Sequence, residues 1–299
     1  MKYSWYKPSD TDAIVAALNQ CFPEKKISNQ SFIWKHFAPF FENKTKCRIA
    51  WHEGKCVSVV CFTPQLLSVF GQEKTVYSCA IQATLVKFRR QGLVSKLTQE
   101  IEESLPPQTE FLGFSNTAGL KIDTHSKRIA YHIVGRFVTT YLPSFLKDDT
   151  YHIELETVTN QNVALGKNEN IIEYGVSDAY LQWRFIDHPK RQYSKYKILS
   201  NRKILGYFFS HVDSQSVNIT KLVLDIDKIS SELLSTIAHH LWQNHHKAVS
   251  ITYLKNTFWQ RKIPLLSLTK PENIHLTVKA NNHELKNASS WMLMGGDIQ

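Results

Sequence analysis

Residues 85–97, LVKFRRQGLVSKL, join a strand-like stretch to a helix through a tight turn that contains arginine, glutamine and glycine. The preceding run TVYSCAIQATLVKF predicts a long strand that ends at residue 86 or 87. In the helix that follows, apolar residues recur every fourth position and share one face; they are Leu93, Leu97, Ile101 and Leu105. A strand that leads directly into an amphipathic helix favours an α/β fold in which the helix packs on a sheet.

The turn itself has the features of an anion-binding site. The first N–H groups of a helix have no internal acceptor, and they carry the positive end of the helix dipole. Gly92 would let a ligand approach the backbone without a Cβ in the way, and Arg89 and Arg90 add charge beside it. We therefore expect a pyrophosphate to bind the N–H groups of about residues 90–95, which are Arg90, Gln91, Gly92, Leu93, Val94 and Ser95.

The length of 299 residues fits two domains of about 150 residues each. A polar stretch at residues 145–172 offers a seam, so we predict domains at 1–147 and 148–299. In the first domain the expected order is strand, two helices, three strands, helix, strand, helix, strand. Ser9 or Asp10 would cap the first helix, and Ser28 the second.

Composition indicates a globular protein, with 42% apolar residues to form a core. We see neither a secretory signal nor an apolar run long enough to span a membrane, so we expect a cytoplasmic protein with no membrane insertion. Five cysteines without CxxC spacing predict reduced thiols and no metal site. The net charge is +10, and residues 184–203 are strongly basic; this stretch would attract anions such as CoA, or form a solvated face.

Several segments resemble the GNAT N-acetyltransferases. The run Arg89-x-x-Gly92-x-Val94 resembles the acyl-CoA pyrophosphate motif of that superfamily, Arg/Gln-x-x-Gly-x-Gly/Ala, with Val94 in place of the usual small residue. Residues 111–116, FLGFSN, and 129–135, IAYHIVG, resemble the family's next strand and its last segment. In the second half, YLQWRF at 180–185 and WMLMGGD at 291–297 resemble stretches of two-domain GNAT-like proteins.

The resemblance implies a mixed, largely antiparallel GNAT-type sheet flanked by helices, followed by a second, smaller GNAT-like α/β domain. The second half has no second Arg-x-x-Gly turn, so one acyl-CoA site per chain is expected. By analogy with the family, the backbone of Leu85 and Val86 would pair with the pantetheine. Asn116 would hydrogen-bond it, or else cap a turn.

The resemblance also suggests candidates for proton transfer. Tyr131 is a candidate for the acid that protonates the CoA thiolate, with a core aromatic as the alternative. Asp123 and His125 precede it in a polar segment and would contact substrate or CoA, or lie in an exposed loop.

The function expected from these features is transfer of an acetyl or other acyl group from acyl-CoA to a primary amine, with an amino sugar as the most attractive acceptor. Two alternatives stay open: a Fem-like transferase that uses aminoacyl-tRNA, and a non-catalytic acyl-CoA-binding protein. Acyl-CoA and a small amine are the expected partners, and no specific nucleic acid is expected. The sequence does not indicate an oligomeric state.

Overall fold

The computed structural model describes residues 1–38, 41, 44–117, 119–120, 131–156, 169–174, 177–255 and 257–298. Its strands are β1 (Lys2–Trp5), β2 (Lys46–His52), β3 (Lys55–Val69), β4 (Gln72–Thr84), β5 (Phe111–Ser115), β6 (His132–Tyr141), β7 (Tyr151–Glu156), β8 (Ile172–Tyr174), β9 (Ser194–Ser200), β10 (Lys203–Val212), β11 (Ser216–Leu224), β12 (Ala248–Leu254) and β13 (Leu268–Lys279). Its helices include α1 (Thr11–Cys21), α2 (Asn29–Phe37), α3 (Leu93–Glu103), α5 (Asp178–Leu181), which continues into a π-helix (Gln182–Ile186), and α6 (Ser231–His245).

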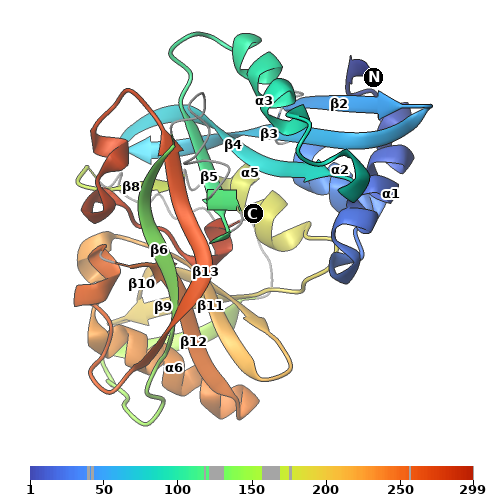
Figure 1. Cartoon of the computed structure of the whole chain (residues 1–299). Coiled ribbons are helices and arrows are strands. Elements are labelled where there is room, and N and C mark those ends of the chain that lie inside the picture. Colours follow the sequence, from blue (N-terminus) through green and yellow to red (C-terminus); the bar gives the residue numbers. More distant parts are fainter. Residues whose placement is uncertain are drawn as a thin grey trace.

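These strands form one sheet in the order β1-β2-β3-β4-β5-β13-β6-β12-β11-β10-β9-β7, and β8 pairs with β3. Most neighbours in the sheet are antiparallel, and helices pack against it (Figure 1). The expected mixed α/β sheet is therefore confirmed. The periodic apolar face predicted for this helix is confirmed too, because Leu93, Leu97 and Ile101 of α3 are buried, and so is Leu105 just after its end.

Two local expectations need correction. The long strand β4 ends at Thr84, before residue 86, and residues 86–88 form a 3-10 turn. The chain turns because Leu85 makes the last bond to β3, N to Val57 O, and its own carbonyl accepts from Phe88 N. At α1, Asp10 precedes the helix but its carboxylate accepts from Lys7 N instead of a helix amide. The predicted cap of α2 is confirmed, since Ser28 accepts from the amide of Ser31.

The two halves of the sheet exchange strands at its centre. β13, the last strand of the chain, lies between β5 and β6 and pairs antiparallel with both. β6 belongs to the first half of the chain, yet its other neighbour is β12 of the second half. Figure 1 shows β6 and β13 side by side, running from one half of the molecule into the other. A domain boundary near residue 147 stays a prediction, and the sheet on either side of it includes strands from both halves of the chain.

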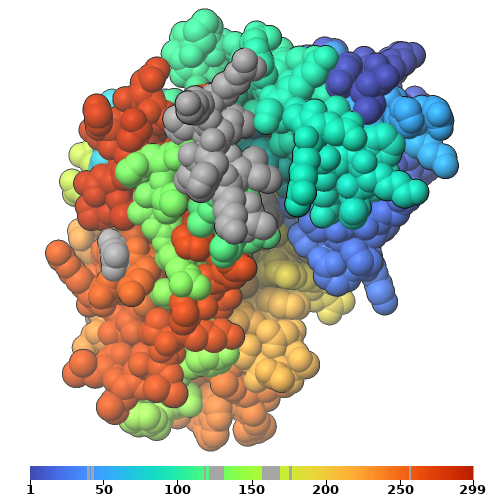
Figure 2. All heavy atoms as spheres, in the orientation of Figure 1, coloured from blue at the N-terminus to red at the C-terminus, as the bar shows by residue number. Residues whose placement is uncertain are grey.

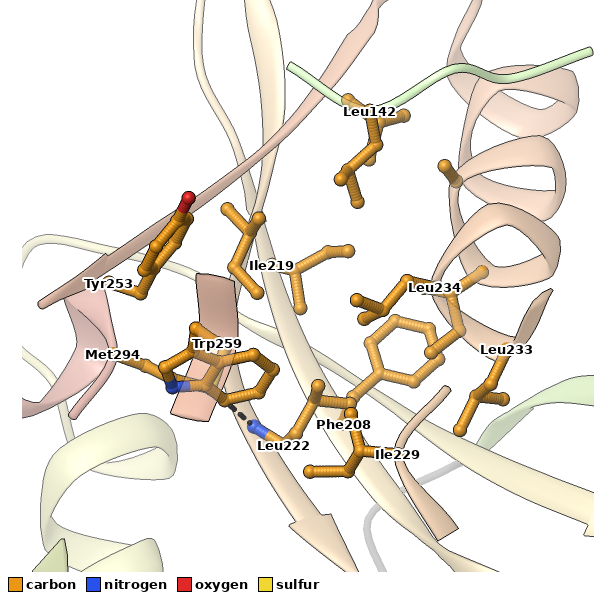
Figure 3. Packing of buried hydrophobic residues seen from close by; sticks show 14 of the residues in the cluster. Leu142, Phe208, Ile219, Leu222, Ile229, Leu233, Leu234, Tyr253, Trp259 and Met294 are labelled. Atoms are coloured by element: carbon orange, nitrogen blue, oxygen red, sulfur yellow. Dashed lines mark hydrogen bonds between the residues drawn. The ribbon is translucent and has the colours of Figure 1, made fainter. Parts of the chain in front are cut away.

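The hydrophobic core also connects the two halves of the chain. One cluster packs α6 on the strands of the second half, where Leu233, Leu234 and Ile219 surround Phe208 (Figure 3). Another cluster contains residues of both halves, among them Leu67 and Val76 from the first half and Trp183, Tyr207 and Leu293 from the second. Separating the halves would expose this shared cluster to water. In the space-filling view, orange and red atoms of the last quarter of the chain lie directly against the N-terminal half (Figure 2).

Two tryptophans connect α2 to the π-helix. The indole Nε1 of Trp34 donates to the carbonyl of Trp183, and the indole of Trp183 donates to the carbonyl of Trp34, each at 2.9 Å. Their rings are stacked, with centroids 5.1 Å apart. Because each N–H finds a partner in the other half, Trp183 is buried and Trp34 half-buried without loss of a hydrogen bond.

The C-terminal segment is anchored by a buried ion pair. The carboxylate of Asp297 accepts from Lys221 Nζ at 2.9 and 3.2 Å, from Tyr180 Oη at 3.1 Å and from Met294 N at 2.9 Å. The side chains of Lys221 and Asp297 are 1% and 0% exposed. Arg184 donates to the carbonyls of Gly296 and Ile298 beside them.

We predict that Asp297→Asn destabilises the protein by about 3–5 kcal/mol, because it leaves the ammonium of Lys221 buried without an anion. Urea unfolding monitored by tryptophan fluorescence gives the free energy of unfolding. The matched control is Asp227→Asn at an exposed position, which should change it by about 0.5 kcal/mol or less. Equal stability of the two variants would contradict the anchoring role of Asp297.

Candidate functional site

The candidate site begins where β4 and β5 separate. These strands pair in parallel at only two positions, Tyr77 with Phe111 and Ser78 with Leu112. Just beyond them, the register of β4 against β3 skips Ala80, which is therefore the extra residue of a β-bulge. A bulge bends its strand and increases the local twist. The bend coincides with the end of the pairing, so the rest of β4 diverges from β5.

The divergence exposes one backbone edge of β4. At the end of the strand, Leu85 N donates to Val57 O on β3. N–H groups alternate in direction along a strand, so those of Gln82 and Thr84 point the other way, toward the gap. An extended ligand could hydrogen-bond this edge as an added strand would.

A cavity of about 720 Å³ fills the gap and continues to the start of α3. Among the described residues that line it, Arg89 and Arg90 are the only charged ones, and there is no carboxylate or imidazole. The described lining consists of Cys21, Phe22, Cys79, Ala80, Gln82, Ala83, Thr84, Phe88, Arg89, Arg90, Gly92, Leu93, Val94, Ser95, Gly113, Phe114, Ser115, Asn116, Gly119 and Tyr131. The structure thus brings together most of the residues expected for acyl-CoA binding.

The start of α3 is open to a ligand. Gly92 precedes the helix with φ of 72°, a left-handed conformation that glycine adopts without strain. The first helical hydrogen bond runs from Lys96 N to Gly92 O, so the amides before Lys96 have no helical acceptor. No described side chain caps this end, and its first turn has no acidic residue. No described atom lies within 4 Å of the place where a Cβ on Gly92 would stand.

Arg89 links this turn to the end of β4. Its Nε donates to Thr84 O at 3.1 Å, while the residue as a whole is exposed. Cys21, at the end of α1, lies close to the same guanidinium. Burial raises the pKa of the Cys21 thiol, and the charge of Arg89 partly offsets this. The cavity mouth is therefore cationic, with a neutral thiol beside it at pH 7.

Two expected pantetheine contacts lie outside the cavity wall. The amide of Leu85 already donates to Val57, and Val86 is 70% exposed on the 3-10 turn. Backbone pairing by these two residues stays a prediction. The edge of β4 that faces the gap lies further back, between Cys79 and Thr84.

The remaining predicted residues have mixed positions. Asn116 lines the cavity and also caps a turn, because its Oδ1 accepts from Gly119 N at 2.9 Å. Tyr131 is 7% exposed; it packs in the apolar cluster beneath α3 and also lines the cavity. Val94 is half-buried against the same cluster. Asp123 and His125 lie outside the described residues.

Sequence reasoning missed several lining residues. Cys21 is the last residue of α1 and Phe22 follows it, while Cys79 and Phe114 come from β4 and β5. No local pattern marks them, since α1 reaches the cavity only through its packing on the sheet. On β4, the polar residues Gln82 and Thr84 also line the cavity.

The second half repeats the geometry but not the chemistry. β11 and β12 are also parallel, and their pairing stops after Ile219 with Ile251. The C-terminal segment lies between them beyond that point. Leu222 N donates to Met294 Sδ (Figure 3), and Leu254 N to Leu293 O. The gap that would correspond to the first cavity is thus occupied by the chain itself.

The helix start next to this second gap also differs. Ser230 caps α6 by accepting from Leu233 N, and Glu232 lies in the first turn. A capped helix start with an acidic residue disfavours an anion, in contrast to the start of α3.

The basic stretch at 184–203 is largely used within the protein. Arg184 bonds the C-terminal carbonyls, and Lys195 and Lys197 lie 3.0 and 3.5 Å from the buried carboxylate of Glu156. Lys190 Nζ donates to the carbonyl of Lys26. Much of the positive charge of this stretch is therefore paired within the protein. This agrees neither with a surface that attracts external anions nor with a fully solvated face.

Comparisons with known proteins agree with this geometry. Residues 2–113 match the family model of the acetyltransferase (GNAT) domain. The fold is similar to a probable N-acyltransferase of Enterococcus faecalis, with TM-score 0.66, 9% identity, and coverage of 95% of this chain and 73% of the other. A GCN5-related N-acetyltransferase of Anabaena variabilis has TM-score 0.65 and 14% identity, with coverage of 95% of this chain and 74% of the other. A tandem GNAT protein from the clavulanic acid biosynthesis pathway has TM-score 0.62 and 8% identity, with coverage of 93% of this chain and 98% of the other.

The resemblance to the GNAT superfamily is thereby confirmed: residues 2–113 match the GNAT domain model, and the fold of the chain is similar to that of a tandem GNAT protein. No curated protein shows significant sequence similarity to it. At such low identities the solved structures establish the fold alone, and the family match ends before the second half.

We predict a graded loss of CoA affinity from changes in the turn. Arg89→Ala and Arg90→Ala should each cost on the order of 1–3 kcal/mol, the range for hydrogen bonds to charged groups. Gly92→Glu should cost more, because it puts a like charge beside the phosphates and a side chain in the open approach. Isothermal titration calorimetry with CoA measures the affinity of each variant. Lys87→Ala, exposed and absent from the cavity wall, is the control. A folded Gly92→Glu variant with wild-type affinity would show that this turn does not bind the pyrophosphate.

Proposed function

We propose that the protein is an acyl-CoA-dependent N-acyltransferase that moves an acetyl or similar group to a primary amine. The observation that carries the proposal is the continuous cavity of about 720 Å³. It joins an uncapped helix start and two arginines to a strand edge with inward-facing amides. These are the groups needed for a pyrophosphate at one end and an extended amide-rich arm at the other.

The proposed reaction needs no metal or redox group. The amine nitrogen attacks the thioester carbonyl, a C–N bond forms, and the C–S bond breaks to release CoA. Amides at the β4 bulge, near Ala80, would stabilise negative charge on the carbonyl oxygen. Such a donor typically contributes about 3–4 kcal/mol to lowering the barrier. Tyr131 would protonate the departing thiolate.

The acceptor is best sought among amines of low basicity. The described cavity wall offers no carboxylate to hold an ammonium group, and its mouth is cationic. A protonated alkylamine would lose hydration there without gaining a partner. Amino sugars carry weaker bases, which supports them as the proposed acceptor. A glucosamine N-acetyltransferase region of a fungal multi-domain protein is among the similar folds, with TM-score 0.57 and 10% identity.

The same proposal places the protein in the cytoplasm, where acyl-CoA and reducing conditions occur together. All five cysteines are free thiols, which suits a reducing compartment. None of the helices in the described part of the chain is long and apolar enough to cross a membrane.

We predict that acetyl-CoA raises the melting temperature and that the protein acetylates at least one amino sugar. Differential scanning fluorimetry at millimolar acetyl-CoA tests binding, because a ligand that binds only the native state stabilises it. Free CoA release, measured with a thiol reagent across an amine panel, tests turnover. Absence of a thermal shift with acetyl-CoA and with longer acyl-CoAs would contradict the donor. A shift without turnover would favour the non-catalytic alternative.

We further predict one CoA bound per chain. The second gap is filled by the C-terminal segment around Met294, and the helix beside it is capped by Ser230. Titration calorimetry should give a stoichiometry near one, and Arg89→Ala should weaken that single binding event. Two CoA molecules per chain would show that the second unit also binds the donor.

A further inference from the structure

The exchanged strand β13 brings a histidine from the second half next to the cavity. His275 stands directly opposite Ser115 on β5 and opposite Arg136 on β6. Residues directly opposite in an antiparallel pair share one face of the sheet, with Cβ atoms about 4.5–5.5 Å apart. Ser115 lines the cavity, so His275 lies immediately behind part of the cavity wall.

Neighbouring residues on β13 show which face this is. Thr277 Oγ1 donates to the carbonyl of Gly113, another lining residue, at 3.3 Å. Lys279 Nζ lies 2.7 Å from the carboxylate of Glu102 on α3. Alternate residues of a strand share a face. His275 therefore lies on the face that carries α3, with the cavity-lining residues Gly113 and Ser115.

The imidazole of His275 is suited to accept a proton. It is half-buried, and its Nδ1 has no hydrogen-bond partner among the described residues although the atom is inaccessible to solvent. Burial lowers the pKa of His275, the charge of Arg136 lowers it further, and the backbone of Ser115 partly offsets both. The ring is therefore neutral at pH 7, and a neutral imidazole has one nitrogen available as an acceptor.

Neither of the two residues that face the His275 ring is an acid or a competing base. Arg136 faces it from β6, and its own Nε donates to the carbonyl of Glu272. Ser115 faces it from β5. Among the described residues of the cavity wall there is no imidazole and no carboxylate, so no strong proton acceptor of the first half is described there.

We propose that His275 is a positioning residue for acyl transfer that takes up the amine proton through the hydroxyl of Ser115. The proposal rests on the proposed N-acyltransferase function. As the amine nitrogen bonds to the thioester carbon and the C–S bond breaks, the amine proton passes to Ser115 Oγ. Nδ1 of His275 accepts no hydrogen bond from the described residues, so a side-chain rotation first brings Ser115 Oγ within hydrogen-bond distance of it. The hydroxyl proton of Ser115 then passes to this nitrogen, and water or Tyr131 protonates the CoA thiolate. The strand contributed by the second half would then complete the catalytic site of the first.

The test compares His275→Gln, Ser115→Ala and the double variant with wild type. His275→Gln should lower kcat/KM by about 10²-fold, the lower end of the range for acid–base catalysis. The fall of kcat/KM at acidic pH, where His275 becomes protonated, should disappear in this variant. The double variant should be no slower than the slower single variant, because both residues act in one relay. His283→Gln, exposed on the same C-terminal segment, is the control and should match wild type.

The acetyl-CoA-induced shift in melting temperature reports folding and donor binding in every variant, and it should stay at the wild-type value. Ser115→Ala provides the second route if His275→Gln does not fold. An active wild type whose His275→Gln variant keeps its rate and its acid limb would overturn this proposal and leave the proposed function standing. A wild-type protein without turnover on any amine would overturn both.

Discussion

The backbone pairing of β13 with β5 and β6 is the interaction on which the rest of the structure depends. Without β13, the inner edges of β5 and β6 would present unpaired N–H and C=O groups. The apolar cluster shared by the halves, with Leu276 and Val278 in it, would open to water. The reciprocal tryptophan pair and the buried ion pair of Asp297 add directional contacts at the same junction. Each half of the chain therefore depends on the other to complete the backbone pairing at the centre of the sheet.

The same topology appears twice in this sheet with opposite consequences. In each half two parallel strands pair briefly and then diverge, β4 from β5 and β11 from β12. In the first half the gap stays open, because the bulge at Ala80 bends β4 and the following helix starts on an uncapped glycine. In the second half Met294 and its neighbours fill the gap and Ser230 caps the helix. The chemistry of a few terminal residues, not the fold, decides which gap can take a ligand.

Local sequence patterns predicted individual helices and strands well, but they did not predict which distant segments pair with each other. The fourfold apolar spacing of α3 and the Arg89–Gly92 turn are short-range features, and both are visible in the sequence. The bulge at Ala80 and the insertion of β13 between β5 and β6 depend on pairing between distant segments, for which a single sequence carries no signal. For the same reason Cys21 and Phe22 of α1 could not be recognised as parts of the cavity wall, and nothing linked His275 to Ser115 before the register was known.

The charge of +10 shows how composition can mislead about binding. The sequence leaves two interpretations of the densest basic stretch, at residues 184–203: a surface that attracts anions, or a solvated face. In the structure Arg184 donates to backbone carbonyls, and Lys195 and Lys197 pair with the buried carboxylate of Glu156, because a charge inside a protein needs a partner to offset its lost hydration. Arg89 and Arg90 are fewer, but they are exposed at a cavity mouth whose described wall has no carboxylate. Their field is therefore available to an incoming anion, so the position of two arginines matters more here than the sum of the charges.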